Sequence, residues 1–159
     1  MNKKRKIIIA VVCVLVVAVI AVCAGVGYYY TRPERTAQKV LTAVYTMDEA
    51  EIQKRREAID NKTFDAYIRD LCGDAVTDNC IDGMITASPL YYGATPAKVE
   101  SIKFSPIDKA TSDTASFQYT AVFSDDSDVK ERIGHVVMKK ENGKWRVNSF
   151  GTKSITRAD

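Results

Sequence analysis

The stretch Arg132–Phe150, RIGHVVMKKENGKWRVNSF, decides the fold because it is typical of two strands around a tight turn. Asn142-Gly143 tolerates the positive φ angles of the two-residue turns that match the twist of paired strands. Strands are therefore predicted over Arg132–Lys140 and Lys144–Phe150. Pairing about the turn gives three cross-strand pairs: Lys140 with Trp145, Met138 with Val147, and Val136 with Ser149.

This pairing places the apolar side chains of the hairpin on one face, which we expect to meet the core. Upstream, Thr114–Phe123 predicts another strand, because its aromatic and small apolar residues alternate with more polar ones. A less regular strand is predicted from Val99 to Phe104. The second half of the chain is therefore expected to form an antiparallel meander.

The chain before Pro89 has helical periodicity instead. Glu34–Tyr45 carries apolar residues on one face, Asp48–Ile59 is mostly charged and is expected to lie outermost, and Thr63–Leu71 stops at Gly73. Asp78–Ala87 repeats the amphipathic pattern. Helices followed by an antiparallel meander predict an α+β fold, with the helices packed on one face of a curved sheet.

The N-terminal segment predicts a membrane anchor. Residues 7–30 contain no charged side chain, and a helix of about 24 residues would be about 36 Å long, enough to cross a bilayer core. Basic residues before the segment and aromatic ones at its far end predict a single-pass protein in the cell membrane, with its N-terminus in the cytoplasm and its C-terminus outside. These flanking residues are Lys3, Lys4, Arg5, Lys6, Tyr28, Tyr29 and Tyr30.

Two alternatives to a retained anchor stay open. Val22-Cys23-Ala24 is compatible with cleavage of a secretory signal. Cys23 is also a candidate for lipid attachment, although Val22 stands where lipoprotein signals have a small residue. All three interpretations put the folded part outside. We expect a cytoplasmic tail at residues 1–6, an anchor at 7–30, a spacer at 31–35, one domain at 36–151 and a C-terminal tail at 152–159.

Charge balance argues against a nucleic-acid partner. The chain has 23 basic and 20 acidic residues, but four of the basic ones precede the apolar segment, so 19 basic and 20 acidic residues follow it. Nucleic-acid binders carry a one-sided basic field, which this composition does not supply.

In element order, the chain resembles the nuclear-transport-factor-two-like, or cystatin-like, superfamily. The residues that carry the likeness are the opening helix at 37–45, the helices at 64–85 and the closing hairpin Gly134–Phe150 with its NGKWRV turn. The resemblance implies a cone of helices against a bent sheet. Relatives with one N-terminal anchor include assembly-factor domains of type IV secretion and conjugation machines, while other members bind ligands or act as ketosteroid-isomerase-like enzymes.

Cys72 and Cys80 are the two cysteines of the outer domain, and the turn-forming stretch between them contains Gly73. An extracytoplasmic location permits a disulfide if the chain bends there, because a straight helix would separate the two residues by about 12 Å. Buried free thiols are the alternative. The chain has no Cys-x-x-Cys motif, so redox catalysis is not expected.

Aromatic residues are candidates for the lining of a pocket at the open end of the cone, with ordinary core packing as the alternative. His135 is the only histidine and is expected on the surface, so neither a two-histidine metal site nor a catalytic triad is predicted. Asp125, Asp126 and Asp128 are interpreted as a solvated loop. The candidate lining residues are Tyr91, Tyr92, Phe104, Phe117, Tyr119 and Trp145.

Together these patterns predict a membrane-tethered interaction or scaffold domain without enzymatic activity, metal or cofactor. We expect it to be an accessory subunit of a cell-envelope, conjugation or secretion complex. Its expected partners are the lipid bilayer, other envelope proteins or a second copy of itself. The alternative function is binding of a small ligand outside the cytoplasm.

Overall fold

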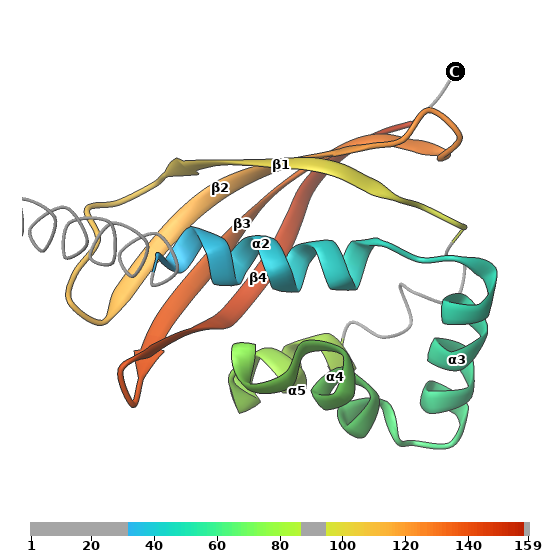
Figure 1. Cartoon of the computed structure of the whole chain (residues 1–159), viewed down its shortest axis with the longest axis horizontal. Coiled ribbons are helices and arrows are strands. Elements are labelled where there is room, and N and C mark those ends of the chain that lie inside the picture. Colours follow the sequence, from blue (N-terminus) through green and yellow to red (C-terminus); the bar gives the residue numbers. More distant parts are fainter. Residues whose placement is uncertain (1–31, 87–94, 158–159) are drawn as a thin grey trace, which may run out of the picture. The chain divides into compact units, whose positions relative to one another are not determined.

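The computed structural model describes residues 32–86 and 95–157. In this part of the chain, four α-helices precede four strands, so the predicted α+β class is confirmed. Figure 1 shows the helices together on one face of a twisted sheet. The anchor flanks, Cys23, Tyr91 and Tyr92 lie outside the described residues.

Helix α2 (Pro33–Tyr45) opens the domain and buries the apolar face that its sequence predicts. Pro33 suits the first position of a helix, where its missing N–H costs nothing. Ala37, Val40, Leu41, Val44 and Tyr45 are at most 3% exposed. This helix contacts β1, β3 and β4, so it is the main cover of the sheet.

The other helices pack on one another beside α2, which α4 contacts. Helix α3 (Glu49–Asp60) begins where the Asp48 carboxylate accepts a hydrogen bond from the Glu51 N–H at 2.7 Å. Helix α4 (Phe64–Cys72) ends at Gly73, whose φ of 60° favours glycine. A 3₁₀ turn, η1 (Gly73–Ala75), then leads to α5 (Asp78–Thr86).

The sheet has the order β1-β2-β3-β4 and is antiparallel throughout. Its strands are β1 (Val99–Pro106), β2 (Thr114–Phe123), β3 (Val129–Glu141) and β4 (Lys144–Arg157). The alternation predicted for β2 is confirmed, because its inward-facing residues are buried. They are Ala115, Phe117, Tyr119, Ala121 and Phe123.

The hairpin turn and most of its pairing are as predicted. Lys140 lies opposite Trp145, and Met138 opposite Val147. The predicted pair of Val136 with Ser149 is wrong, because a bulge shifts the register and sets Val136 opposite Phe150.

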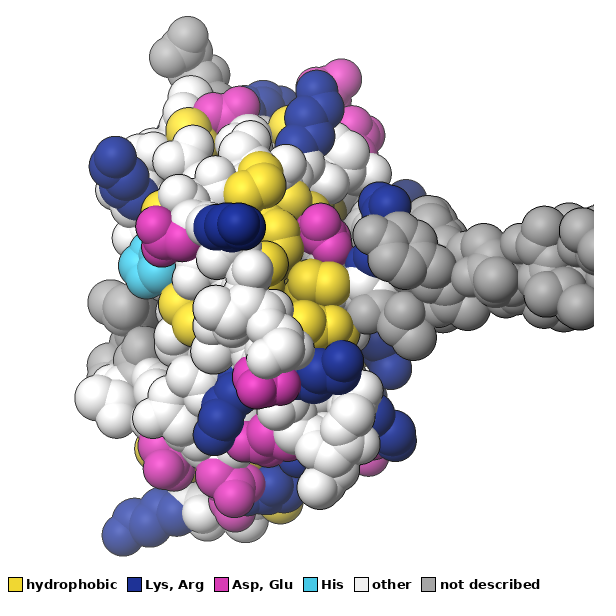
Figure 2. All heavy atoms as spheres, turned by 90° about the vertical axis from the view of Figure 1, so that its left-hand side faces the viewer, with side chains coloured by type: hydrophobic (Ala, Val, Ile, Leu, Met, Phe, Trp, Pro, Cys, Tyr) yellow, Lys and Arg dark blue, Asp and Glu magenta, His cyan; other side chains and the backbone are white. Residues whose placement is uncertain are grey.

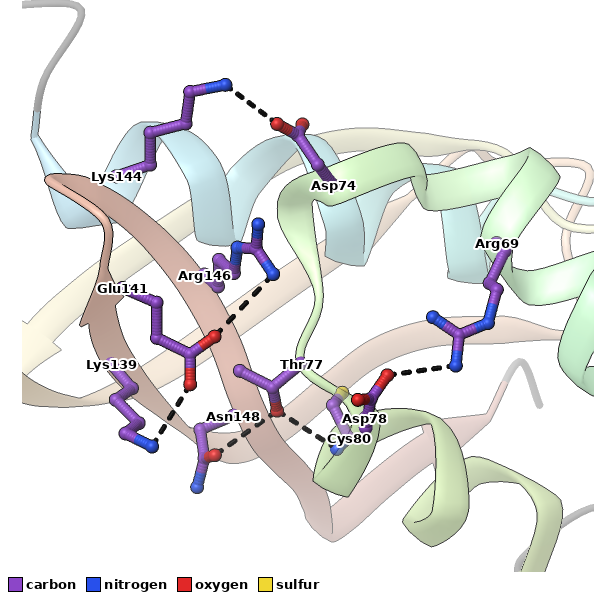
Figure 3. Close-up of polar contacts among 10 residues, drawn as sticks. All are labelled: Arg69, Asp74, Thr77, Asp78, Cys80, Lys139, Glu141, Lys144, Arg146 and Asn148. Carbon is purple, nitrogen blue, oxygen red and sulfur yellow. Dashed lines mark hydrogen bonds and ion pairs between the residues drawn. The ribbon is translucent and has the colours of Figure 1, made fainter.

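Asn148 is the extra residue of this bulge, and the chain before α5 holds it in place (Figure 3). The Thr77 hydroxyl donates to Asn148 Oδ1 at 3.2 Å, and Asn79 Nδ2 donates to the Asn148 carbonyl at 2.9 Å. The Thr77 N–H also donates to the Val147 carbonyl at 3.0 Å. Residues 76–79 therefore cover the outer edge of β4 near its start.

The expected C-terminal tail at 152–159 is wrong for residues 152–157, which belong to β4. These residues pair with β3, which is 13 residues long, as far as Val129 opposite Arg157. β-Branched residues favour this extended conformation, and three of the six residues are of that type. They are Thr152, Ile155 and Thr156.

A second bulge, between Ile133 and Gly134, surrounds the tightest approach in the sheet. A Cβ atom on Gly134 would lie 2.1 Å from the Gly151 carbonyl oxygen and 2.4 Å from the Tyr119 hydroxyl. No side chain larger than hydrogen fits there without moving both groups.

Replacing Gly134 with alanine is therefore expected to lower the free energy of unfolding by about 2 kcal/mol or more. Gly83→Ala in α5 is the matched control, because its Cβ would meet nothing within 4 Å. The control should be neutral or stabilising by up to about 1 kcal/mol. Urea unfolding of the full chain in detergent micelles measures both, and equal effects would contradict the close approach at Gly134.

Candidate functional site

Four of the expected pocket residues lie in the described part of the chain: Phe104, Phe117, Tyr119 and Trp145. Phe117 and Tyr119 are buried on the inner face of β2, and the Phe104 ring packs edge-on against Phe117 with centroids 6.0 Å apart. Trp145 lies at the β3–β4 turn, with Lys140 Nζ 5.8 Å from its ring centroid. The core-packing alternative therefore accounts for Phe117 and Tyr119.

Tyr119 instead belongs to a chain of hydrogen bonds that sequence reasoning missed. Its hydroxyl lies 2.5 Å from the Tyr45 hydroxyl and donates to the Gly151 carbonyl at 3.2 Å. Tyr45 is also 3.5 Å from the Thr152 hydroxyl. Since Tyr119 gives its single proton to Gly151, Tyr45 must donate to Tyr119, and Thr152 can donate to Tyr45.

In this series of hydrogen bonds, the hydroxyl protons of Tyr45 and Tyr119 are both donated within the protein and are not free for catalysis. Burial, together with the neighbouring Tyr45, raises the pKa of Tyr119 far above its ordinary value, so it remains neutral. No carboxylate in the described residues hydrogen-bonds to either tyrosine. An acid–base pair of the isomerase type is therefore not assembled at this point.

Arg132 is the charged group beside these tyrosines. It lies opposite the fully buried Ala121 in the β2–β3 ladder, so its side chain starts on the inner face of the sheet. Its guanidinium carbon is 4.4 Å from the Tyr45 ring centroid and 5.9 Å from that of Phe123. Arg132 forms no ion pair with the described residues, so stacking on aromatic rings is what holds it.

A second polar cluster connects three helices. Arg55, only 2% exposed, donates from Nε to the Tyr67 hydroxyl at 3.0 Å and from Nη1 to the Val44 carbonyl at 3.1 Å. Tyr67 in turn donates to Glu51. Burial and the Glu51 contact raise the pKa of Tyr67. Arg55 thus satisfies a carbonyl near the end of α2, which is a structural role.

Cys72 and Cys80 are both buried and carry free thiols, as in the second of the two alternatives. Burial raises the pKa of Cys72 to about 11 and that of Cys80 to about 12. A thiol that keeps its proton at neutral pH is a poor nucleophile. These groups therefore act as core side chains in this structure.

His135 is exposed on the outer face of β3, in agreement with the prediction. Asp125, Asp126 and Asp128 are exposed in the loop between β2 and β3. Among the described residues, no three histidine, cysteine, aspartate or glutamate side chains come together as metal ligands.

Ionic contacts are spread over the surface rather than gathered at one site. Near the β3–β4 turn, Lys144 pairs with Asp74 at 2.9 Å, and Glu141 lies 3.0 Å from Lys139 and 3.5 Å from Arg146 (Figure 3). In Figure 2, basic and acidic side chains are interspersed around a small apolar area. This face offers no patch of one sign.

The end of β4 differs from the rest of the described surface. We call Thr152–Arg157 the β4 end; all six of its residues are exposed although they stay in a ladder with β3, whose register shifts at Lys153 and again between Val129 and Glu131. Ile155, 45% exposed, pairs with Arg132 and so shares the inner face with it. In Figure 1 this part of the strand runs past the helices towards the C-terminus.

Comparison with known proteins adds no assignment. No protein-family model matches the sequence, and a search of curated proteins finds no match. In the described part of the chain, no helix has the length and apolar composition needed to cross a bilayer.

The buried thiols predict a pH dependence of stability. Their native pKa values lie above the ordinary 9.0, so above about pH 9 the unfolded chain loses thiol protons that the folded chain keeps. The free energy of unfolding should therefore fall as the pH rises from 9 to 11. A variant with both Cys72→Ala and Cys80→Ala should show a shallower fall.

Urea titrations at several pH values measure this slope. At pH 6 neither thiol is ionised in either state, so the difference between variant and parent there reports only the lost packing. Equal slopes above pH 9 would show that the thiols are not desolvated in the folded protein.

Proposed function

We propose that the chain is a membrane-tethered extracytoplasmic interaction domain, an accessory subunit of a cell-envelope complex such as a secretion or conjugation apparatus. The tether rests on the sequence of residues 1–30, with its basic cluster, uncharged segment and aromatic flank. The type of complex rests on the family resemblance of the element order.

The β4 end is the observation that carries this proposal. A strand whose residues are exposed while its backbone stays in the ladder presents a rigid surface rather than a loose tail. The interior argues in the same direction, because Phe117 and Tyr119 fill the inner face of β2 and the tyrosine hydroxyls bond to each other. We therefore place the proposed function on the surface of the domain.

Small-ligand binding is the second candidate, and Arg132 favours it. Its guanidinium, which forms no ion pair with the described residues, lies beside Tyr45 at the end of the sheet where Ile155 is exposed, which would suit a small anion with an apolar part. Such a ligand would increase the thermal stability of the full chain in proportion to its concentration.

Crosslinking in intact membranes tests the leading proposal. A photoreactive amino acid is placed in turn at Ser154 and Thr156 of the β4 end, and at Ser101 and Lys103 of β1 as matched exposed controls on the opposite edge of the sheet. We expect the β4 positions to give discrete products with envelope proteins, and the β1 positions to give several-fold less.

Crosslinked products from any exposed position would still support an interaction function. The positions that give the most product would then locate the interaction surface. Absence of products from every position, with the protein correctly inserted, would contradict the proposal and favour the ligand-binding candidate.

A further inference from the structure

We infer that the β4 end accepts an extended, acidic segment of a partner protein as a fifth strand of the sheet. This inference rests on the proposed interaction function and names the chemistry of the partner.

The backbone of the β4 end lies at one edge of the sheet. β4 is an edge strand, and residues 76–79 cover only its beginning, through the Val147 and Asn148 carbonyls. Beyond the ladder with β3, no described residue donates to or accepts from the backbone of Thr152–Arg157. Within the described part of the chain, the outer N–H and C=O groups of this stretch are therefore open to another strand.

The β4 end continues the strand past a bulge. The sequence TKSITR contains neither proline nor glycine. Lys153 is the extra residue of the bulge opposite Ile133 and Gly134, and Ser154–Arg157 continues in the ladder beyond it. Peptides that add to a sheet edge gain main-chain hydrogen bonds along the strand and are selected by alternate side chains. The residues beyond the bulge, Ser154–Arg157, are long enough for such a contact, since strands of about three residues or more occur in proteins.

The β4 end also carries basic side chains. Lys153 and Arg157 form no ion pair with the described residues, and neither does the neighbouring Arg132. Lys130 is engaged by Asp125 at 3.8 Å, and Glu131 is the only carboxylate of β3 opposite this stretch. The edge therefore carries an excess of positive charge, which favours a strand with carboxylates.

The same charges argue against a second copy as the occupant. Antiparallel pairing of two β4 ends would gather two Lys153 and two Arg157 side chains along one short ribbon, and like charges across strands are destabilising. Lysine on an exposed edge is a known protection against self-pairing. The occupant we infer is thus a different chain, with carboxylates alternating with β-branched residues.

Hydrogen exchange tests this inference on the full chain in zwitterionic detergent micelles. The probe is a capped peptide in which glutamate alternates with valine and threonine, and its counterpart has lysine in place of glutamate. The acidic peptide should slow exchange in residues 152–157 by about tenfold when its concentration is about ten times its dissociation constant. The lysine counterpart should not.

Two double variants separate charge from folding. Lys153→Glu with Arg157→Glu should abolish the slowing without changing the unfolding midpoint. Lys103→Glu with Lys109→Glu changes the net charge equally at exposed positions on β1 and in the following loop, and should leave the slowing intact.

Four outcomes would overturn the inference. They are no slowing by the acidic peptide, equal slowing by the lysine peptide, slowing without peptide that grows with protein concentration, and slowing without peptide when anionic lipid is added to the micelles. The last two would identify a second copy and a membrane surface as the occupant. Membrane crosslinks from other surfaces of the domain would still support an interaction function, so the two failures are distinguishable.

Discussion

The hydrogen bonds that run from Thr152 through Tyr45 and Tyr119 to the Gly151 carbonyl hold helix α2 to the sheet, and the rest of the domain depends on them. They join the first helix to β2 and β4, which lie far apart in sequence. Because unpaired buried hydroxyls are costly, the four groups stabilise one arrangement of helix and sheet. This arrangement requires a glycine at position 134, because a Cβ atom there would displace the Tyr119 hydroxyl.

Polar groups inside the domain are bonded within the protein. The hydroxyls of Tyr45 and Tyr119 and the Arg55 guanidinium all hydrogen-bond to groups of the protein itself. Beyond Gly151 the strand continues while the exposure of its residues rises. The domain therefore places an exposed strand edge, with a bulge and basic side chains, at the end of the sheet.

Much of the fold could be predicted from the sequence, because local patterns determine it. The apolar face of α2, the alternation of Phe117 to Phe123 and the Asn142-Gly143 turn each depend on residues close together in the chain. The bulges could not be predicted, since they depend on Thr77, Asn79 and Tyr119 reaching distant strands. For the same reason the sequence does not show that Tyr119 is a hydrogen-bonded core residue. The length of β4 is not visible in the composition of that strand either, because it depends on pairing with β3 as far as Val129.

A double-mutant cycle on Tyr45→Phe and Tyr119→Phe tests the role of the hydroxyl chain most directly. The free energies of unfolding of the parent, both single variants and the double variant are measured on the full chain. The structure predicts a coupling free energy of about 1 kcal/mol, because each hydroxyl loses its value once the other is gone. Additive effects, with a coupling near zero, would show that the two hydroxyls do not hold helix and sheet together.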